Sequence, residues 1–99
     1  MQRLLNFMIA LRRMPPLSEL SGDEERLLFE IRQAWEYHGS VSVSDVYAMV
    51  QSKSASTAYR TALSLKEKGL IDFEVDPADK RRREIRFTSK ADYLFNSIK

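Results

Sequence analysis

Residues 54–87 carry the stretch that decides the fold, SASTAYRTALSLKEKGLIDFEVDPADKRRREIRF. Small or apolar residues recur in it at the spacing of one helix face: Ala58, Ala62 and Leu65. Gly69 ends this pattern, because glycine is favoured just past a helix end. From Ile71 onward apolar and polar residues alternate, which is the period of a β-strand. We therefore predict a helix over residues 54–68 with Ser54 as its N-cap, followed at once by a β-hairpin.

The predicted hairpin has one apolar face and a basic tip. The apolar positions are Ile71, Phe73, Val75, Ile85 and Phe87. Residues 77–80, Pro-Ala-Asp-Lys, have the composition of a turn. Four cations then stand side by side at the tip and the start of the return strand: Lys80, Arg81, Arg82 and Arg83. Because adjacent like charges repel one another, this run favours an anionic partner.

Two more helices are predicted directly upstream. Residues 21–24, Ser-Gly-Asp-Glu, form a capping box that opens a helix ending near Gly39. Residues 41–43 are expected to be a short extended piece. Ser44 and Asp45 are expected to cap a second, short helix that runs to about Val50.

Both ends of the chain carry predicted apolar helices. Residues 3–14 are apolar on more than one face, and Pro15 and Pro16 stop that helix. It could pack on its own domain, but we favour pairing with a second subunit, because one small domain covers only one side of it. Thr88 or Ser89 caps a last helix with an apolar stripe. The expected dimer contacts are Leu4, Leu5, Met8, Leu11, Leu94, Phe95 and Ile98.

Composition excludes several classes of protein. A chain of 99 residues is one compact domain, and without cysteine and with a single histidine it can form neither a disulfide scaffold nor a thiolate or multi-histidine metal site. No nucleophile–base pair, paired carboxylates or phosphate-binding glycine loop is present, so we expect a non-enzyme with no cofactor and no metal. The N-terminal apolar run is too short to span a bilayer, and we expect no membrane partner.

Charge is distributed unevenly along the chain. Residues 1–52 hold five arginines and seven acids, a net charge of −2. Residues 53–99 hold eleven lysines or arginines and seven acids, a net charge of +4. An acidic partner is therefore expected to bind the second half.

The predicted fold is mainly α-helical with a small β-hairpin, an α+β arrangement. Two short helices joined by a tight turn and followed by a hairpin match the winged helix-turn-helix plan, in which the second helix reads the major groove. Polar residues lie on the side of residues 54–68 away from the expected core: Ser54, Ser56, Thr57, Tyr59, Arg60 and Ser64. The helix N-terminus suits phosphate, Arg60 can reach guanine, and Tyr59 can reach a phosphate or a thymine methyl.

Residues 24–95 resemble the MarR-like winged-helix regulators. The resemblance rests on residues 56–60 and 65–71, which look like the family's recognition helix and helix end. The resemblance also rests on the family's wing pattern, which this chain matches with Asp79-Lys80-Arg81 and then Ile85-Arg86-Phe87-Thr88. It implies that Asp79 holds the wing turn and orients Arg81 into the minor groove. It further implies that Ser56, Thr57 and Arg60 lie on the major-groove face; the phosphate contacts of Arg82 and Arg83 are inferred from charge.

The sequence thus predicts a transcriptional regulator that binds double-stranded DNA sequence-specifically as a homodimer. Its expected location is the cytoplasm, at the prokaryotic nucleoid. Residues 1–16 would be the dimerisation element and residues 17–99 the winged-helix domain. MarR-like proteins usually end in two long helices that border an effector pocket. Only about ten residues follow Thr88 here, which argues against a small-molecule effector of that kind. The alternative is a winged-helix module that binds protein in a replication or partition assembly.

Overall fold

Helices dominate the computed structural model, which describes residues 2–49 and 54–98. The described elements, in chain order, are α1 (Gln2–Arg13), η1 (Leu17–Glu19), α2 (Gly22–His38), α3 (Val43–Met49), α4 (Ala55–Glu67), β1 (Ile71–Val75), β2 (Arg83–Phe87) and α5 (Ser89–Ile98). Here η1 is a single 3-10 turn. This order confirms the predicted class, mainly α-helical with one hairpin.

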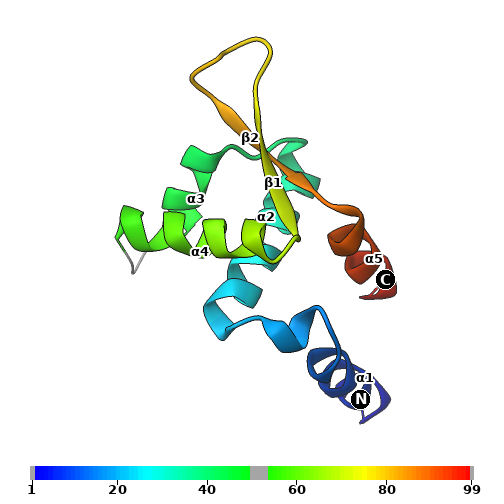
Figure 1. The fold of residues 1–99 in the computed structure, drawn as a ribbon. Coiled ribbons are helices and arrows are strands. Elements are labelled where there is room, and N and C mark those ends of the chain that lie inside the picture. Colours follow the sequence, from blue (N-terminus) through cyan, green and yellow to red (C-terminus); the bar gives the residue numbers. More distant parts are fainter. Residues whose placement is uncertain (1, 50–53, 99) are drawn as a thin grey trace.

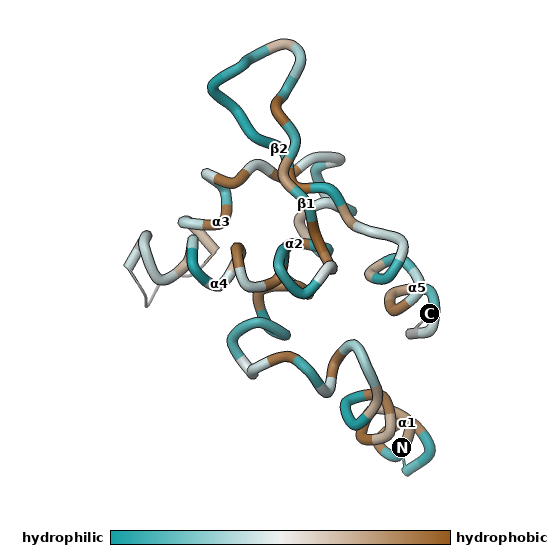
Figure 2. Tube along the Cα trace, viewed as in Figure 1, coloured by the Kyte–Doolittle hydropathy of each residue, from teal (hydrophilic) through white to brown (hydrophobic). Residues whose placement is uncertain are grey.

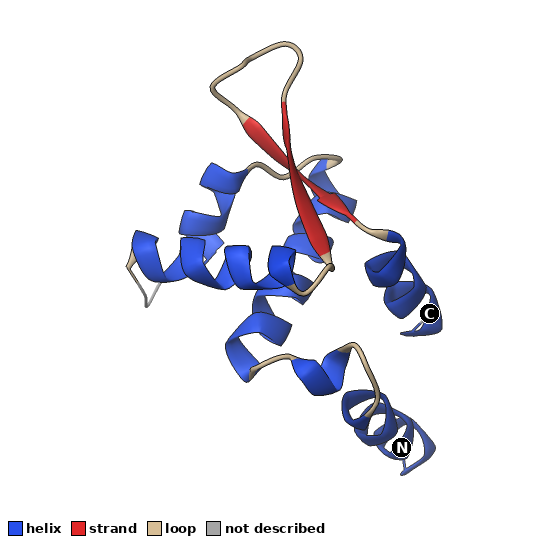
Figure 3. Cartoon of the chain, viewed as in Figure 1, coloured by secondary structure: helices blue, strands red, loops and turns tan. Residues whose placement is uncertain are grey.

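The helices and the hairpin are arranged around one apolar core. In Figure 1 the hairpin projects from the domain at one end, and α1 lies at the opposite end beyond η1. Figure 3 shows α3 and α4 joined as a helical pair beneath the hairpin, with α5 following the second strand. Residues from α2, α3, α4, both strands and α5 fill the core. Its largest fully buried side chains are Leu28, Ile31, Val41, Val46, Leu65, Leu70, Ile71, Ile85 and Leu94.

The hairpin is antiparallel and extends to a third, very short partner. Ile71 pairs with Phe87, and Phe73 pairs with Ile85. On the other edge of β2 the Ile85 N–H donates to the carbonyl of Val41 at 2.8 Å, and Ser42 forms an isolated bridge. The extended piece predicted after α2 therefore docks the start of α3 on the hairpin.

Side-chain caps fix where the helices begin. The predicted capping box of α2 is confirmed, since Ser21 and Glu24 exchange backbone and side-chain hydrogen bonds. The predicted cap of α3 is wrong, because α3 begins at Val43, one residue before Ser44. Ser42 caps it instead: its hydroxyl accepts from the N–H of Asp45 at 3.2 Å, and the Asp45 carboxylate accepts from the N–H of Ser42 at 2.8 Å.

The predictions for α5 need one correction. Thr88 is its cap, because the Thr88 hydroxyl accepts from the N–H of Ala91 at 3.3 Å. Leu94 and Phe95 are 2% and 6% exposed and pack in the core of their own domain. Predicting them as dimer contacts is therefore wrong, since an amphipathic stripe alone does not tell which surface covers it. The side chain of Ile98 and the predicted helix end at Val50 lie outside the described residues.

Candidate nucleic-acid interface

The N-terminus of α4 is built from hydroxyl side chains. Ser54 is its N-cap as predicted, with its hydroxyl accepting from the Thr57 N–H at 3.2 Å. The same oxygen lies 3.0 Å from the Thr57 hydroxyl and 3.2 Å from the Ser56 hydroxyl. The first turn contains no acidic residue. Free N–H groups and the helix dipole therefore meet no nearby negative side chain of that turn, which suits an anionic ligand.

The side chains of α4 divide between the core and the outside. Three positions predicted to face the core do so, because they are fully buried: Ala58, Ala62 and Leu65. Ser54, Ser56 and Arg60 are exposed, and Thr57 is half-buried. Arg60 makes no ion pair with another described residue. The N-terminal half of α4 thus presents a polar surface with one unneutralised cation.

Ser64 was predicted on the outer side of α4, and this placement is wrong. Its hydroxyl donates to the Glu24 carboxylate, and the Lys68 ammonium donates to the other oxygen of that carboxylate at 2.7 Å. Glu24 is only 6% exposed. Burial raises the pKa of Glu24, but hydrogen bonds from Lys68, the Ser21 N–H and Ser64 outweigh it and lower this pKa from 4.5 to about 2.

The turn of the hairpin is held by two aspartates. The Asp79 carboxylate accepts from the backbone N–H of Arg81 at 3.0 Å, and the Asp76 carboxylate accepts from the N–H of Ala78 at 2.8 Å. The backbone closes the loop, with the Arg82 N–H donating to the Asp79 carbonyl at 2.9 Å. Asp79 thus occupies the position from which it can hold the wing turn. Asp76 was missed because the MarR-like pattern begins three residues later.

The four adjacent cations of the hairpin have different environments. Lys80 and Arg81 are exposed at the tip and form no ion pair with the other described residues. Arg82 folds back, with its guanidinium 3.6 Å from the Asp76 carboxylate and 3.4 Å from the Ser40 hydroxyl. Of the four, Lys80 and Arg81 are the best placed to meet an anion, and Arg82 is partly neutralised.

A cation–aromatic stack ties the base of the hairpin to α4. The rings of Tyr59 and Phe73 stack with centroids 6.5 Å apart. The Arg83 guanidinium lies 5.9 Å and 5.8 Å from these two rings, and the Lys66 ammonium lies 5.3 Å from the Phe73 ring. Tyr59 is accordingly half-buried, and its ring contributes to packing. This contact joins the base of the hairpin to α4.

Arg32 was not singled out by the sequence, yet it joins three elements. Its guanidinium lies 4.6 Å from the ring of Trp35, 4.7 Å from that of Phe95 and 5.0 Å from that of Phe87. It also pairs with Asp92 at 3.4 Å. These contacts fix α5 against α2 and β2. Periodicity alone could not reveal them, because they join residues far apart in the chain.

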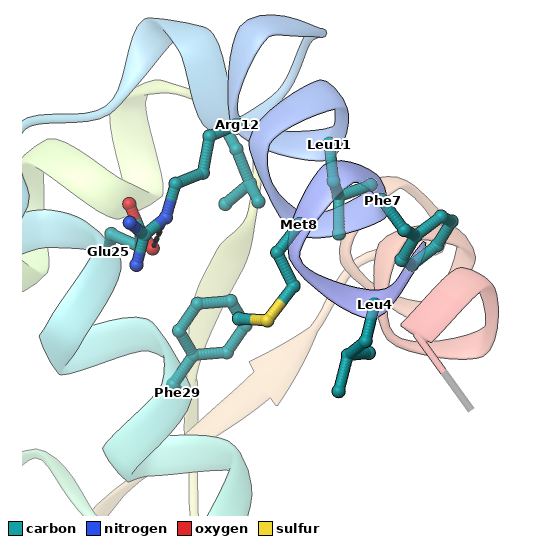
Figure 4. Close-up of a pocket in the computed structure, with 8 residues that line it drawn as sticks. Leu4, Phe7, Met8, Leu11, Arg12, Glu25 and Phe29 are labelled. Carbon is teal, nitrogen blue, oxygen red and sulfur yellow. Dashed lines mark hydrogen bonds and ion pairs between the residues drawn. The ribbon is translucent and has the colours of Figure 1, made fainter. Parts of the chain in front are cut away.

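Five of the large hydrophobic side chains that are exposed to solvent lie on the helix α1. None of its described residues is buried, and Figure 2 shows hydrophobic segments along it. The exposed side chains are Leu4, Leu5, Phe7, Met8 and Ile9. One edge of α1 borders a hollow of about 330 Å³ against α2, where Met8 extends toward the ring of Phe29 (Figure 4). An ion pair of 3.1 Å between Arg12 and Glu25 closes one side of it.

Comparison with solved structures shows which fold this is. A variant of S. aureus MepR bound to an oligodeoxyribonucleotide matches with a TM-score of 0.71 and 18% identity, over 99% of this chain and 73% of that one. A MarR-like transcriptional regulator from Thermotoga maritima matches with a TM-score of 0.69 and 19% identity, over 98% of this chain and 68% of that one. A variant of E. coli MarR complexed with operator DNA matches with a TM-score of 0.65 and 18% identity, over 98% of this chain and 69% of that one.

The chain has the MarR-like winged-helix fold. The predicted fold class and the resemblance to MarR-like structures are confirmed at the level of the fold. No protein-family model matches the sequence, and no curated protein matches it.

The described residues hold neither a candidate metal site nor a candidate membrane-spanning helix. Within residues 2–49 and 54–98, no group of three or more histidine, cysteine, aspartate or glutamate side chains could hold a metal ion. Among the helices in the same part of the chain, none combines the length and apolar character needed to cross a membrane.

Proposed function

We propose that this protein binds double-stranded DNA sequence-specifically and regulates transcription. The observation that carries the proposal is the contact that joins α4 to the base of the basic hairpin. In that arrangement Ser56, Thr57 and Arg60 face the major groove, and the hairpin follows the backbone. Three structural neighbours, two of MepR and one of MarR, are bound to DNA, and this supports the same role for the chain.

Each part of the surface has a separate task. The hydroxyls and free N–H groups at the start of α4 fix the helix on phosphates, and such contacts set register without reading sequence. Arg60 supplies base readout, because a guanidinium can bond two acceptors of guanine at once. Arg81 at the wing tip enters the minor groove, where a narrow groove concentrates negative potential. Lys80 contributes a phosphate contact, with Arg83 nearer the helix.

We further propose that the protein acts as a homodimer through α1. The apolar side chains on α1 that stay in solvent would be covered by the same helix of a second subunit. A two-fold dimer would place two α4 helices about 34 Å apart, one turn of duplex DNA. The proposed site of action is the prokaryotic nucleoid. No small-molecule effector is part of this proposal.

The test begins with in vitro selection of duplexes from a random pool. Binding of Arg60→Ala and Arg81→Ala to the selected site is then measured by fluorescence anisotropy over a series of salt concentrations. Arg60→Ala should weaken binding by about 1–3 kcal/mol and relax the preference at one base pair. Arg81→Ala should weaken binding to all sequences and lower the salt dependence by about one phosphate contact.

Arg86→Ala is the matched control. Arg86 is an exposed hairpin arginine, but it pairs with Glu74 at 3.1 Å and with Glu84 at 3.0 Å, so its charge is already neutralised. The Arg86→Ala variant should bind the selected duplex with the affinity of the natural protein. Natural affinity in both Arg60→Ala and Arg81→Ala would refute the interface. If the unaltered protein bound no duplex at low salt, the alternative of a protein-binding module would be favoured.

A further inference from the structure

Two neighbouring glutamates in the first turn of α2 hold two different helices. Glu24 faces inward and accepts hydrogen bonds from Ser64 and Lys68 at the C-terminal end of α4. Glu25 pairs with Arg12 of α1 at 3.1 Å. The proposed dimerisation helix and the proposed recognition helix are therefore attached to the same helical turn.

Lys68 extends this junction to the segment that joins α1 to α2. Its ammonium lies 2.7 Å from the Glu24 carboxylate and 2.7 Å from the backbone carbonyl of Glu19, a residue of η1. From α5, the Lys90 ammonium donates to the Lys68 carbonyl at 3.1 Å and pairs with the Glu19 carboxylate at 3.7 Å. We call Glu19, Glu24, Ser64 and Lys68 the polar junction. It joins η1, α2 and α4 at one point.

We propose that Glu24 and Lys68 are positioning residues that set the distance between the two recognition helices of the dimer. They would thereby set the half-site spacing that the protein reads. This inference rests on the proposed function, because it needs both the dimer and DNA binding. Neither residue touches the proposed DNA surface, since the polar junction lies at the end of α4 opposite Ser54.

The leverage of the junction follows from the length of α4. Its 13 residues span about 20 Å at 1.5 Å per residue. A tilt of about 10° at the C-terminal end therefore moves the N-terminal end by about 3 Å, close to the 3.4 Å rise of one base pair. A tilt of this size at the polar junction would thus move the N-terminal end of each α4 by about the rise of one base pair.

The polar junction has the properties of a fixed point. The Glu24 side chain is 8% exposed and that of Lys68 is 33% exposed, so the pair is largely removed from solvent. Within the part of the chain that the structure describes, no buried side-chain nitrogen or oxygen lacks a hydrogen-bond partner. Removing one partner leaves the other charge uncompensated, and such networks favour a single arrangement when they are complete.

The first test uses a duplex series built on the half-site that the unaltered protein selects. The centre-to-centre spacing is stepped by one base pair on either side of about 10 base pairs. A one-step change should lower the affinity of the unaltered protein by about tenfold or more, because both subunits must engage at once. In Glu24→Gln and Lys68→Met the same change should cost less than about threefold.

Two control variants separate positioning from loss of charge or of folding. Glu67→Gln removes a charge from the same end of α4 outside the junction, at an exposed side chain, and Lys68→Arg keeps a cation that can bind Glu24. Both should retain the natural spacing preference. Unchanged preference in both Glu24→Gln and Lys68→Met would overturn the inference. Absence of any spacing preference in the unaltered protein would instead refute the proposed two-fold DNA binding, and the inference with it.

A second measurement needs no DNA. Because the chain has no cysteine, Ser56→Cys gives one spin label per subunit near the start of α4. The distance between the two labels in the dimer should be narrowly distributed, and it should shift or broaden when Glu24→Gln is added. An identical distribution with and without Glu24→Gln would overturn the inference, even if that variant bound DNA weakly.

Discussion

The charged state of Glu24 makes the stability of the fold depend on pH. Replacing it by glutamine keeps the shape of the side chain and removes the charge that Lys68 neutralises. The folded-state pKa of Glu24 is about 2, against 4.5 for the free group. Folding thus lowers the pKa of Glu24 by about 2.5, and at 1.36 kcal/mol for each pKa unit this corresponds to about 3 kcal/mol of stabilisation of the folded state.

The direction of the effect follows from the lowered pKa. The stabilisation is complete above the unfolded pKa of 4.5 and is lost as the pH falls from about 5 toward 2, because the unfolded state binds a proton over this range while Glu24 in the folded state stays charged until about pH 2. The free energy of unfolding of the natural protein should therefore approach that of Glu24→Gln in acid. The gap between the two proteins should narrow by about 3 kcal/mol over this range.

Urea unfolding, followed by circular dichroism at constant ionic strength, measures this gap at each pH. The other carboxylates titrate in both proteins, so their contribution cancels in the difference. A gap that stayed constant between pH 6 and about pH 2.5 would refute the reasoning, because it would mean that folding does not favour the charged form of Glu24. A gap that widened in acid would refute it as well.

Two further outcomes are expected. Leu4→Glu places a charge in the proposed α1 dimer contact and should shift the protein toward monomer in sedimentation equilibrium. The control Asn6→Glu, on the same helix, should leave the dimer intact. A dimer in both variants would exclude the proposed contact. Ser42→Ala removes the cap of α3 and should lower the free energy of unfolding by about 1 kcal/mol. Ser44→Ala should change it by less than about 0.5 kcal/mol in thermal or urea unfolding, and the reverse order would contradict the observed cap.

Much of the fold could be predicted because the local signals agree with one another. The capping box of α2, the cap at Ser54 and the change of period after Gly69 each depend on residues close in the sequence. Each favours the element that the global fold also needs. The cap of α3 can be predicted as well, since Ser42 and Asp45 have the three-residue spacing of a capping box, although Ser44 also carries a hydroxyl that could cap a helix.

The other errors arose where a residue far away in the sequence decides the outcome. Ser64 falls on the polar side of α4 by periodicity, yet Glu24, forty residues earlier, draws it into the junction. Leu94 and Phe95 form a stripe that suits either a partner or the core, and Arg32 helps to fix that stripe inside by packing on Phe95. Helical spacing gives the direction of a side chain but not the identity of what it meets.

The stack of Tyr59, Phe73 and Arg83 has a consequence for the cost of binding. Because α4 and the base of the hairpin are already held together, the loss of conformational freedom on the duplex would be confined to the exposed tip around Lys80 and Arg81 and to the Arg60 side chain. Each side chain that need not be ordered on binding spares about 0.5–1.5 kcal/mol of entropy. The helix α4 and the hairpin would then bind the duplex as one rigid unit. A change of groove width at the hairpin would therefore also alter the position of α4 in the major groove.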